Sequence, residues 1–212
     1  MAQNEFIKTA DLPVAAMDRL RRQVGSWAQE NFGDNLTDLL PTFTVDIDGA
    51  KDALVQVPLI QVSLGSLAPL MGLVEELGEL TDAPDEDEEL DAIGDMGIYL
   101  CDYVSREGLS FHGCISDAKE TIEVSHPSAS LGRLYHCTLK RFQGIRGMDD
   151  LSAFRAAQKT AVAGLLADLT RLSAQGYSKR FDDIVANTWS AIVKKRNWKL
   201  HKENGNVEVI ED

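Results

Sequence analysis

Cysteine is scarce in this chain, and no cysteine or histidine stands in a pattern that binds zinc. The 212 residues include three cysteines, Cys101, Cys114 and Cys137, and no C-x-x-C pair. Cysteines this sparse and widely spaced are typical of buried, reduced thiols in a cytosolic protein. The four histidines also lack the spacing of zinc ligands. The sequence therefore argues against a disulfide scaffold, a structural zinc site and a catalytic cysteine.

Basic residues are outnumbered, and long apolar runs are missing. Thirty-four acidic residues against 21 basic ones give a net charge of −13 and an isoelectric point near 4.7. This balance argues against a general binder of nucleic acid or of anionic membranes. No apolar run approaches transmembrane length, and Asn4, Glu5 and Lys8 interrupt any signal-peptide core. We expect a cytoplasmic protein.

Several well-known catalytic motifs are absent as well. The chain has no P-loop, no G-x-G-x-x-G and no G-x-S-x-G, so neither a glycine-rich phosphate loop nor a serine nucleophile is indicated. What is present is a 44% hydrophobic composition, which is enough to bury one full core. We predict a single helical domain over residues 1–212, with a β-hairpin insertion at 41–63 and a tail at 200–212.

Apolar periodicity and capping residues predict where most helices lie. We expect one helix over residues 13–31 and another that begins at about Ser66, with Pro69 in its first turn. A long helix is expected from Asp149 or Asp150 to about Ala174. A last helix is expected after Ser178, whereas residues 109–123 are ambiguous in pattern and suit a short helix that ends at His126-Pro127. The core face of the 150–174 helix is predicted to consist of Leu151, Phe154, Ala161, Leu165, Leu169 and Leu172.

The stretch Leu73–Tyr103 carries the main chemical signal, because it combines two apolar helical patterns with many acids. Two helices joined by so short a turn pack antiparallel, which brings their acidic faces together. Carboxylates that face one another repel strongly unless a cation lies between them, and oxygen-only ligands select Mg²⁺ or Mn²⁺. The acids within the apolar patterns are Glu75, Glu76, Glu79, Asp91 and Asp95. The alternative is a solvated acidic face, which we assign to residues 85–87 at the start of the second helix.

The same stretch resembles the paired acidic helices of the MazG-like, all-α nucleoside triphosphate pyrophosphatases. These enzymes carry E-x-x-E on one helix and E-x-x-D on the next. Glu76 and Glu79 match the first element, and Asp95 stands at the final aspartate. Ala92 stands where the remaining glutamate belongs, so we take Asp91, one helical turn before Asp95, as the substitute ligand.

This resemblance implies a fold, a reaction and a cofactor. The fold is an all-α, four-helix-bundle core of MazG type, and the reaction is hydrolysis of a (d)NTP to (d)NMP and pyrophosphate in nucleotide-pool control. The implied cofactor is Mg²⁺, with Mn²⁺ as a substitute, held by Glu76, Glu79, Asp91 and Asp95. Glu75 or Glu76 would act as the catalytic base. Family members pair to complete their sites, which implies a homodimer or higher homo-oligomer.

Three further strings are similar to a phage-associated branch of the same family, which implies the host cytoplasm if the chain is viral. They are W-A-Q-E-N-F-G at 27–33, Q-G-I-R-G at 143–147, and the T-W pair followed by V-K-K-R-N-W-K at 193–199. Arginine and lysine in the last two strings would bind phosphate oxygens, since guanidinium binds them bidentately. The implied phosphate-binding residues are Lys140, Arg141, Arg146, Lys195 and Arg196. Alternatively, these cations simply favour helix C-termini.

The second half of the chain shows faint echoes of the acidic helices. Leu131–Leu134 echoes Leu77–Leu80, and Ala161–Leu169 echoes Ala92–Leu100, but the acids are gone. We interpret the echoes as a diverged internal duplication whose second copy has become scaffold; chance apolar matches are the alternative.

Two rival functions remain. One is a related enzyme on the same scaffold, dUTPase-like or of phosphoribosyl-ATP pyrophosphohydrolase type. The other is a non-catalytic relative that binds nucleotides or a partner protein.

Overall fold

The chain forms a helical assembly with one small sheet in the computed structural model, which describes residues 5–32, 64–118, 120–191 and 193–197. The predicted hairpin at 41–63 and the tail at 200–212 lie outside the described residues. In the described part of the chain, no helix combines the length and apolar character that crossing a bilayer requires. The all-α prediction is confirmed at this level.

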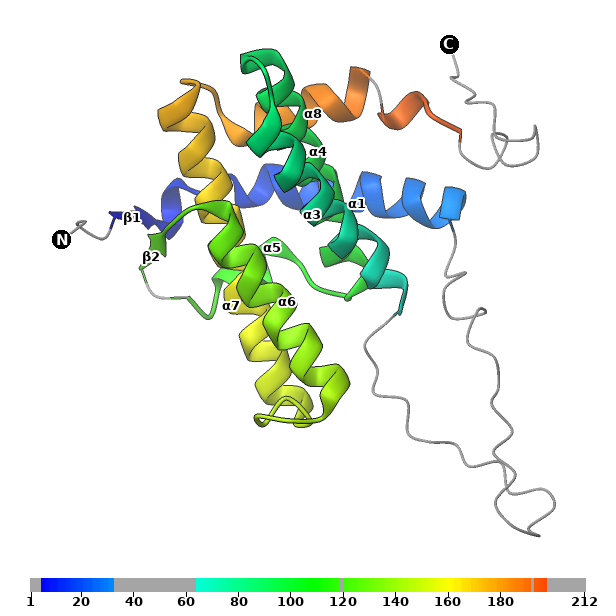
Figure 1. The fold of residues 1–212 in the computed structure, drawn as a ribbon, viewed down its shortest axis with the longest axis vertical. Helices are drawn as coiled ribbons and strands as arrows, with labels where there is room; N and C mark the ends of the chain where they lie inside the picture. The colour runs from blue at the N-terminus through cyan, green and yellow to red at the C-terminus, as the bar shows by residue number, and fades with distance from the viewer. Residues whose placement is uncertain (1–4, 33–63, 119, 192, 198–212) are drawn as a thin grey trace, which may run out of the picture.

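Helix α4 (Glu86–Arg106) lies at the centre of the fold, and the other long helices pack around it (Figure 1). It contacts α3 (Leu67–Asp82), α1 (Val14–Phe32), α8 (Phe181–Ala191) and α7 (Leu151–Gly176). The apolar side of α4 packs inside the fold, where Ile93, Leu100 and Val104 are fully buried in the core. Burial of these side chains supplies the main favourable free energy for assembling the helices.

Helices α3 and α4 form the predicted antiparallel pair. Residues 83–85 join them, and Asp85 caps α4 by accepting hydrogen bonds from the backbone N–H groups of Asp87 and Glu88. The four acids of the first α4 turn lie at the positive end of the helix dipole. The interpretation of residues 85–87 as an exposed cap is therefore confirmed. Helix α4 ends before Gly108, which adopts a left-handed conformation (φ +65°).

Helices α6 (Pro127–Gln143) and α7 (Leu151–Gly176) form a second hairpin beside the first (Figure 1). The Tyr135 hydroxyl ties α6 to α3 by donating to the Leu70 carbonyl at 3.1 Å. The two segments that echo the acidic helices, Leu131–Leu134 and Ala161–Leu169, lie on α6 and α7. The internal duplication stays a hypothesis. The predicted α7 core face is buried at Phe154, but the prediction for Leu151 is wrong: it is 49% exposed, because it begins the helix next to the exposed α6–α7 turn.

A two-stranded antiparallel sheet joins the N-terminus to the segment before α6. Strand β1 (Glu5–Lys8) pairs with β2 (Thr121–Val124), with Glu5 opposite Val124 and Lys8 opposite Thr121. A short helix α5 (Phe111–Ile115) precedes β2, so residues 109–123 contain both the expected helix and an unexpected strand. The described residues also contain three short 3₁₀ segments: η1 (Thr9–Asp11), η2 (Leu64–Ser66) and η3 (Val193–Lys195).

Glycines on α4 allow α8 to pack closely on the helix that carries the acids. A Cβ atom on Gly94 would lie 2.0 Å from Thr188 Oγ1, and one on Gly97 would lie 2.2 Å from Val185 Cγ2. Such distances are far below van der Waals contact, so only glycine fits at this helix–helix approach. The close packing places the end of α8 and η3 beside the acidic side of α4.

Candidate functional site

Glu76 on α3 is a carboxylate buried without compensation. Its side chain belongs to a residue that is 6% exposed, and among the described residues its Oε2 atom has no hydrogen-bond partner. Burial raises the pKa of Glu76 to about 8, and the negative charges of neighbouring acids add to the rise. Those neighbours, in order of effect, are Asp95, Glu79, Glu75 and Asp91. A buried acid surrounded by acids is costly, and a cation would remove that cost.

Asp95 on α4 faces the same cluster from the opposite helix. It is partly buried, and burial together with the charges of Asp91 and Glu79 raises its pKa to about 6. The positive charge of Arg196 acts in the other direction and lowers this pKa. The predicted acids of α3 and α4 are thus brought together, with a cation at their edge.

Helical register places Asp91, and not Ala92, on the acidic side of α4. Ala92 is 2% exposed and points into the core, whereas Asp91 is exposed and raises the pKa values of both Glu76 and Asp95. Residues four apart in a helix lie one above the other on the same face. The spacing of Asp91 and Asp95 therefore allows Asp91 to serve where the expected glutamate is missing.

The acids are neighbours, but they do not already surround one point. In the described ranges, no three His, Cys, Asp or Glu side chains have the arrangement of metal ligands. Glu75, Glu79 and Asp91 are exposed, so their side chains can rotate without disturbing the core. Carboxylate oxygens, including the unpartnered Oε2 of Glu76, are the donors that Mg²⁺ and Mn²⁺ prefer. The donor set fits such a cation after rotation of the exposed acids.

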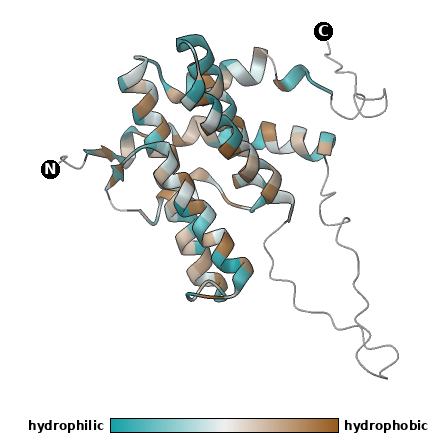
Figure 2. Cartoon of the chain, viewed as in Figure 1, coloured by the Kyte–Doolittle hydropathy of each residue, from teal (hydrophilic) through white to brown (hydrophobic). Residues whose placement is uncertain are grey.

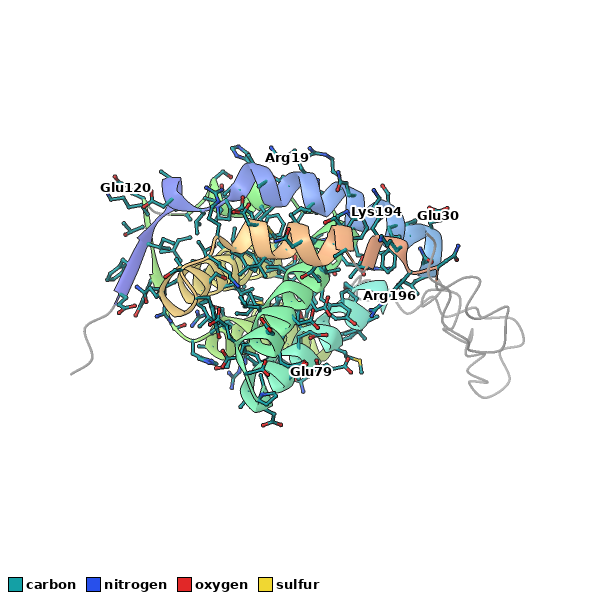
Figure 3. All side chains as sticks on the ribbon, turned by 90° about the horizontal axis from the view of Figure 1, so that it is seen from above. Arg19, Glu30, Glu79, Glu120, Lys194 and Arg196 are labelled. Carbon is teal, nitrogen blue, oxygen red and sulfur yellow. The ribbon has the colours of Figure 1, made fainter. Side chains whose placement is uncertain are left out.

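The five cations predicted to bind phosphate lie in two separate places. Arg196 follows η3 and acts on Asp95, while Lys195 is exposed on η3 itself. Figure 3 shows Arg196 near the end of α1, with Glu79 on the adjoining side of α3. Lys140, Arg141 and Arg146 lie instead at the α6–α7 turn, at the lower end of the molecule in Figure 1.

Arg141 already has a structural role at that turn. It is 9% exposed, and its Nη1 donates to the carbonyl oxygens of Met148 and Asp149. Its guanidinium also lies 5.7 Å from the centre of the Phe154 ring. Lys140 donates to Gln143 at 2.6 Å, and Arg146 is exposed with a left-handed backbone. The turn cations therefore lie apart from the acid cluster of their own chain.

An aromatic pocket of about 240 Å³ opens next to Asp95. Its wall includes Trp27 and Phe32 of α1, whose rings meet edge to face with centroids 5.6 Å apart. Tyr99 lies between the pocket and the acids: burial and the charges of Glu76, Glu75 and Asp95 raise its pKa to about 12. The remaining lining residues are Val24, Ile98, Asp102, Val193 and Arg196.

A second, polar hollow of about 220 Å³ lies on the α8 side of Asp91. Lys179 and Asn187 line it together with Asp87 and Thr188, and Lys179 lies 3.7 Å from Glu86. This hollow and the aromatic pocket occur at successive turns of α4, with Asp91 and Asp95 between them. A ligand with an anionic part and a flat apolar part matches this sequence of surfaces.

Sequence reasoning missed the residues of these two hollows. Trp27 and Phe32 were noted only as part of the string at 27–33, and no role was given to Lys179 or Asn187. Two signals were available: Tyr99 lies four residues after Asp95, and the acidic stripe of α4 continues to Asp102. Which residues of α1 and α8 face that stripe depends on helix packing, which a single sequence does not specify.

Comparison of the chain with protein-family models, with curated proteins and with solved structures finds no match.

Proposed function

We propose that the chain is a Mg²⁺-dependent nucleoside triphosphate pyrophosphohydrolase that converts a (d)NTP and water to the monophosphate and pyrophosphate. The observation that carries the proposal is the buried, unpartnered Oε2 of Glu76, surrounded by acids from two helices. The aromatic pocket beside Asp95 supports a nucleoside as the remaining part of the ligand. The resemblance to the paired E-x-x-E and E-x-x-D helices of the MazG-like enzymes, and to their bundle, supports the reaction type.

Each residue of the site has a defined part in this proposal. Glu76, Glu79, Asp91 and Asp95 hold the divalent ion. When bound, that ion neutralises phosphate oxygens and lowers the pKa of the attacking water. Glu76 is buried and suited to ligation, so exposed Glu75 is better placed to accept the proton of the water.

The positive and aromatic groups position the substrate. Arg196 faces Asp95 and donates to the phosphate nearest the pocket, and Tyr99 separates the phosphates from the nucleoside. Lys179 in the polar hollow would leave its ion pair with Glu86 to bind the far phosphates, where departing pyrophosphate accumulates negative charge.

Neutralising the acids one at a time tests the proposal. We expect Glu79→Gln and Asp95→Asn to lower kcat/KM for Mg²⁺-dependent pyrophosphate release by at least ~100-fold, because each removes a ligand charge. Glu88→Gln is the matched control, since Glu88 is an exposed acid in the first turn of α4, the helix that carries Asp95. If wild-type protein hydrolyses no triphosphate with Mg²⁺ or Mn²⁺, the enzymatic proposal is wrong.

One observation favours the non-catalytic alternative. Ala92 is buried, so α4 supplies aspartates spaced by four residues instead of a glutamate and an aspartate spaced by three. A site altered in this way could bind nucleotide without turnover. Triphosphate binding that depends on Asp95 but produces no pyrophosphate would support this function instead. A substrate panel that includes dUTP and phosphoribosyl-ATP distinguishes the related enzymes.

A further inference from the structure

Asp102, which lines the aromatic pocket, forms an ion pair with a residue of its own helix. Asp102 and Arg106 lie four residues apart on α4, and Asp102 Oδ1 accepts a hydrogen bond from Arg106 Nε at 2.8 Å. The Asp102 side chain is 13% exposed and that of Arg106 is 10% exposed. Asp102 lines the pocket, seven residues beyond Asp95. At 1.5 Å per residue, this places it about 10 Å further along the helix, the span of a nucleoside.

Only part of the hydrogen-bonding capacity of Asp102 is used. Within the described ranges, no hydrogen bond to its Oδ2 atom is present, and Asp102 is one of the residues that line the pocket. Burial raises the pKa of Asp102, whereas the charge and the hydrogen bond of Arg106 oppose that rise. An ionised carboxylate can only accept hydrogen bonds, so the pocket end selects groups that donate them.

The pocket walls are suited to a flat ring. Trp27 is held in place by a 3.1 Å hydrogen bond from its Nε1 to the carbonyl oxygen of Arg196. Trp27, Phe32 and Tyr99 supply aromatic surface on which a base can stack. A base that enters between these rings with its sugar toward Asp95 presents its outer edge to Asp102.

We propose that Asp102 is a specificity-determining residue that selects nucleotides whose base carries an exocyclic amino group. Cytosine, adenine and guanine present N–H donors to the carboxylate, as cytosine N4 does to acidic side chains in nucleic-acid recognition. Uracil and thymine present a carbonyl oxygen at the corresponding position, which the carboxylate repels. This inference rests on the proposed function for the orientation of the nucleotide, since it places the phosphates at Asp95.

Binding of nucleoside monophosphates in the presence of Mg²⁺ tests the preference separately from catalysis, because a monophosphate has no phosphoanhydride bond to cleave. Trp27 lies in the pocket wall and 5.9 Å from Trp189, so a bound base should quench tryptophan fluorescence. We expect CMP to bind about 10- to 100-fold more tightly than UMP, the discrimination that one hydrogen bond to a charged group supplies. Equal binding of CMP and UMP, or tighter binding of UMP, would overturn the proposal.

Variants then assign the preference to Asp102. In Asp102→Asn, whose amide can donate as well as accept, the ratio of the two dissociation constants should fall to near one. Asp102→Glu keeps the charge and is the second variant if the asparagine variant does not fold; it should retain a preference for CMP. Glu88→Gln is the matched acid control and should keep the wild-type ratio. A wild-type ratio in Asp102→Asn would contradict the proposal.

The two proposals fail in different ways. If CMP is preferred but no triphosphate is hydrolysed, the assignment of Asp102 stands and the enzymatic function is wrong. If triphosphates are hydrolysed with equal kcat/KM for CTP and UTP, the enzymatic function stands and the assignment of Asp102 is wrong.

Discussion

At the scale of single residues, Glu76 combines a buried position with four acidic neighbours. Glu76 is 6% exposed, and its neighbours are negatively charged. Both conditions favour the neutral form of its carboxyl group, so its pKa rises to about 8. A structural glutamate in a helical core normally acquires a basic partner or hydrogen-bond donors. The absence of a partner for Oε2 among the described residues is therefore the main reason to assign a ligand to this position.

This raised pKa predicts how stability depends on pH. An acid whose folded pKa exceeds its unfolded pKa binds more protons in the folded state, so the free energy of unfolding falls as pH rises between the two values. For Glu76 this range runs from the ordinary value of 4.5 to about 8, and Asp95 adds to it up to about pH 6. We expect metal-free protein to lose stability from pH 5 to pH 8, by at most roughly 5 kcal/mol from Glu76.

Urea unfolding from pH 5 to pH 9 measures this effect. Glu76→Gln should be more stable than wild type at pH 8 and should show a weaker pH dependence, because the amide needs no proton. Mg²⁺ should raise the Tm of wild type more at pH 8 than at pH 6, since protons compete with the cation for Glu76. A wild-type stability that rises steadily between pH 5 and pH 8 would contradict the account.

Individual site residues were predictable to the extent that their role depends on helical spacing alone. The meeting of Glu76 and Asp95 follows from two amphipathic helices joined by a short turn. The burial of Glu76 relative to exposed Glu75 and Glu79 depends on how α3 rotates against α4, which the spacing left open. Arg196 was predicted beside the phosphates, but the position of Lys140 and Arg146 relative to the acids required the packing of α6 and α7.

At the scale of elements, replacing a glycine by alanine should change the stability of the protein in opposite directions on α3 and on α4. Gly78 lies on the exposed side of α3, where a Cβ would meet nothing within 4 Å, whereas Gly94 lies against Thr188 of α8. We expect Gly78→Ala to stabilise the protein by about 0.5–1 kcal/mol, the usual gain in an exposed helix interior. Gly94→Ala should destabilise it by ~1–3 kcal/mol, because α8 must move to accommodate the methyl group.

Equilibrium urea denaturation of both variants measures the two effects. Gly132→Ala is the control for the general effect of alanine in a helix, since Gly132 is exposed on α6 and a Cβ there also meets nothing within 4 Å. Equal stabilisation by all three alanines would show that α8 does not pack on α4 as described.

Helices were predictable from sequence where apolar periodicity and caps agreed, as in α1, α3, α4 and α7. The β1–β2 pairing was not, because each strand has four residues and its partner lies more than 110 residues away in the chain. A run as short as Thr121–Val124 contains too little alternation to separate a strand from a helical turn. The pairing depends on tertiary packing, with Val124 buried against the core.

At the scale of the whole molecule, the neighbouring helices α3 and α6 both carry exposed apolar side chains, and together they carry charges of both signs; their exposed residues are called the α3–α6 face. Met71, Val74, Leu139 and Phe142 are 38–65% exposed, and Figure 2 shows hydrophobic segments on both helices. The α3 part of this face carries Glu75 and Glu79, whereas the end of α6 and the following turn carry Lys140 and Arg146. A two-fold axis would place the acidic part of each copy against the basic part of the other.

We therefore expect homodimers that pair through the α3–α6 face. Arginine at both Val74 and Leu139 should shift the protein toward the monomer in sedimentation equilibrium, since it places charges in an apolar contact. Phe6→Arg is the control, because Phe6 is 60% exposed but lies on β1, outside this face. If the wild type is monomeric at high micromolar concentration, or the double variant remains a dimer, the predicted face is wrong.

The central claim is that α3 and α4 hold one or more divalent ions between Glu76 and Asp95. A crystal soaked with Mn²⁺ and a non-hydrolysable nucleoside triphosphate, measured for the anomalous scattering of manganese, tests it most directly. We expect an anomalous peak within ligand distance of Glu76, Glu79 and Asp95, with the base in the pocket formed by Trp27 and Tyr99. A manganese peak elsewhere with these carboxylates unliganded, or no peak at all, would contradict it.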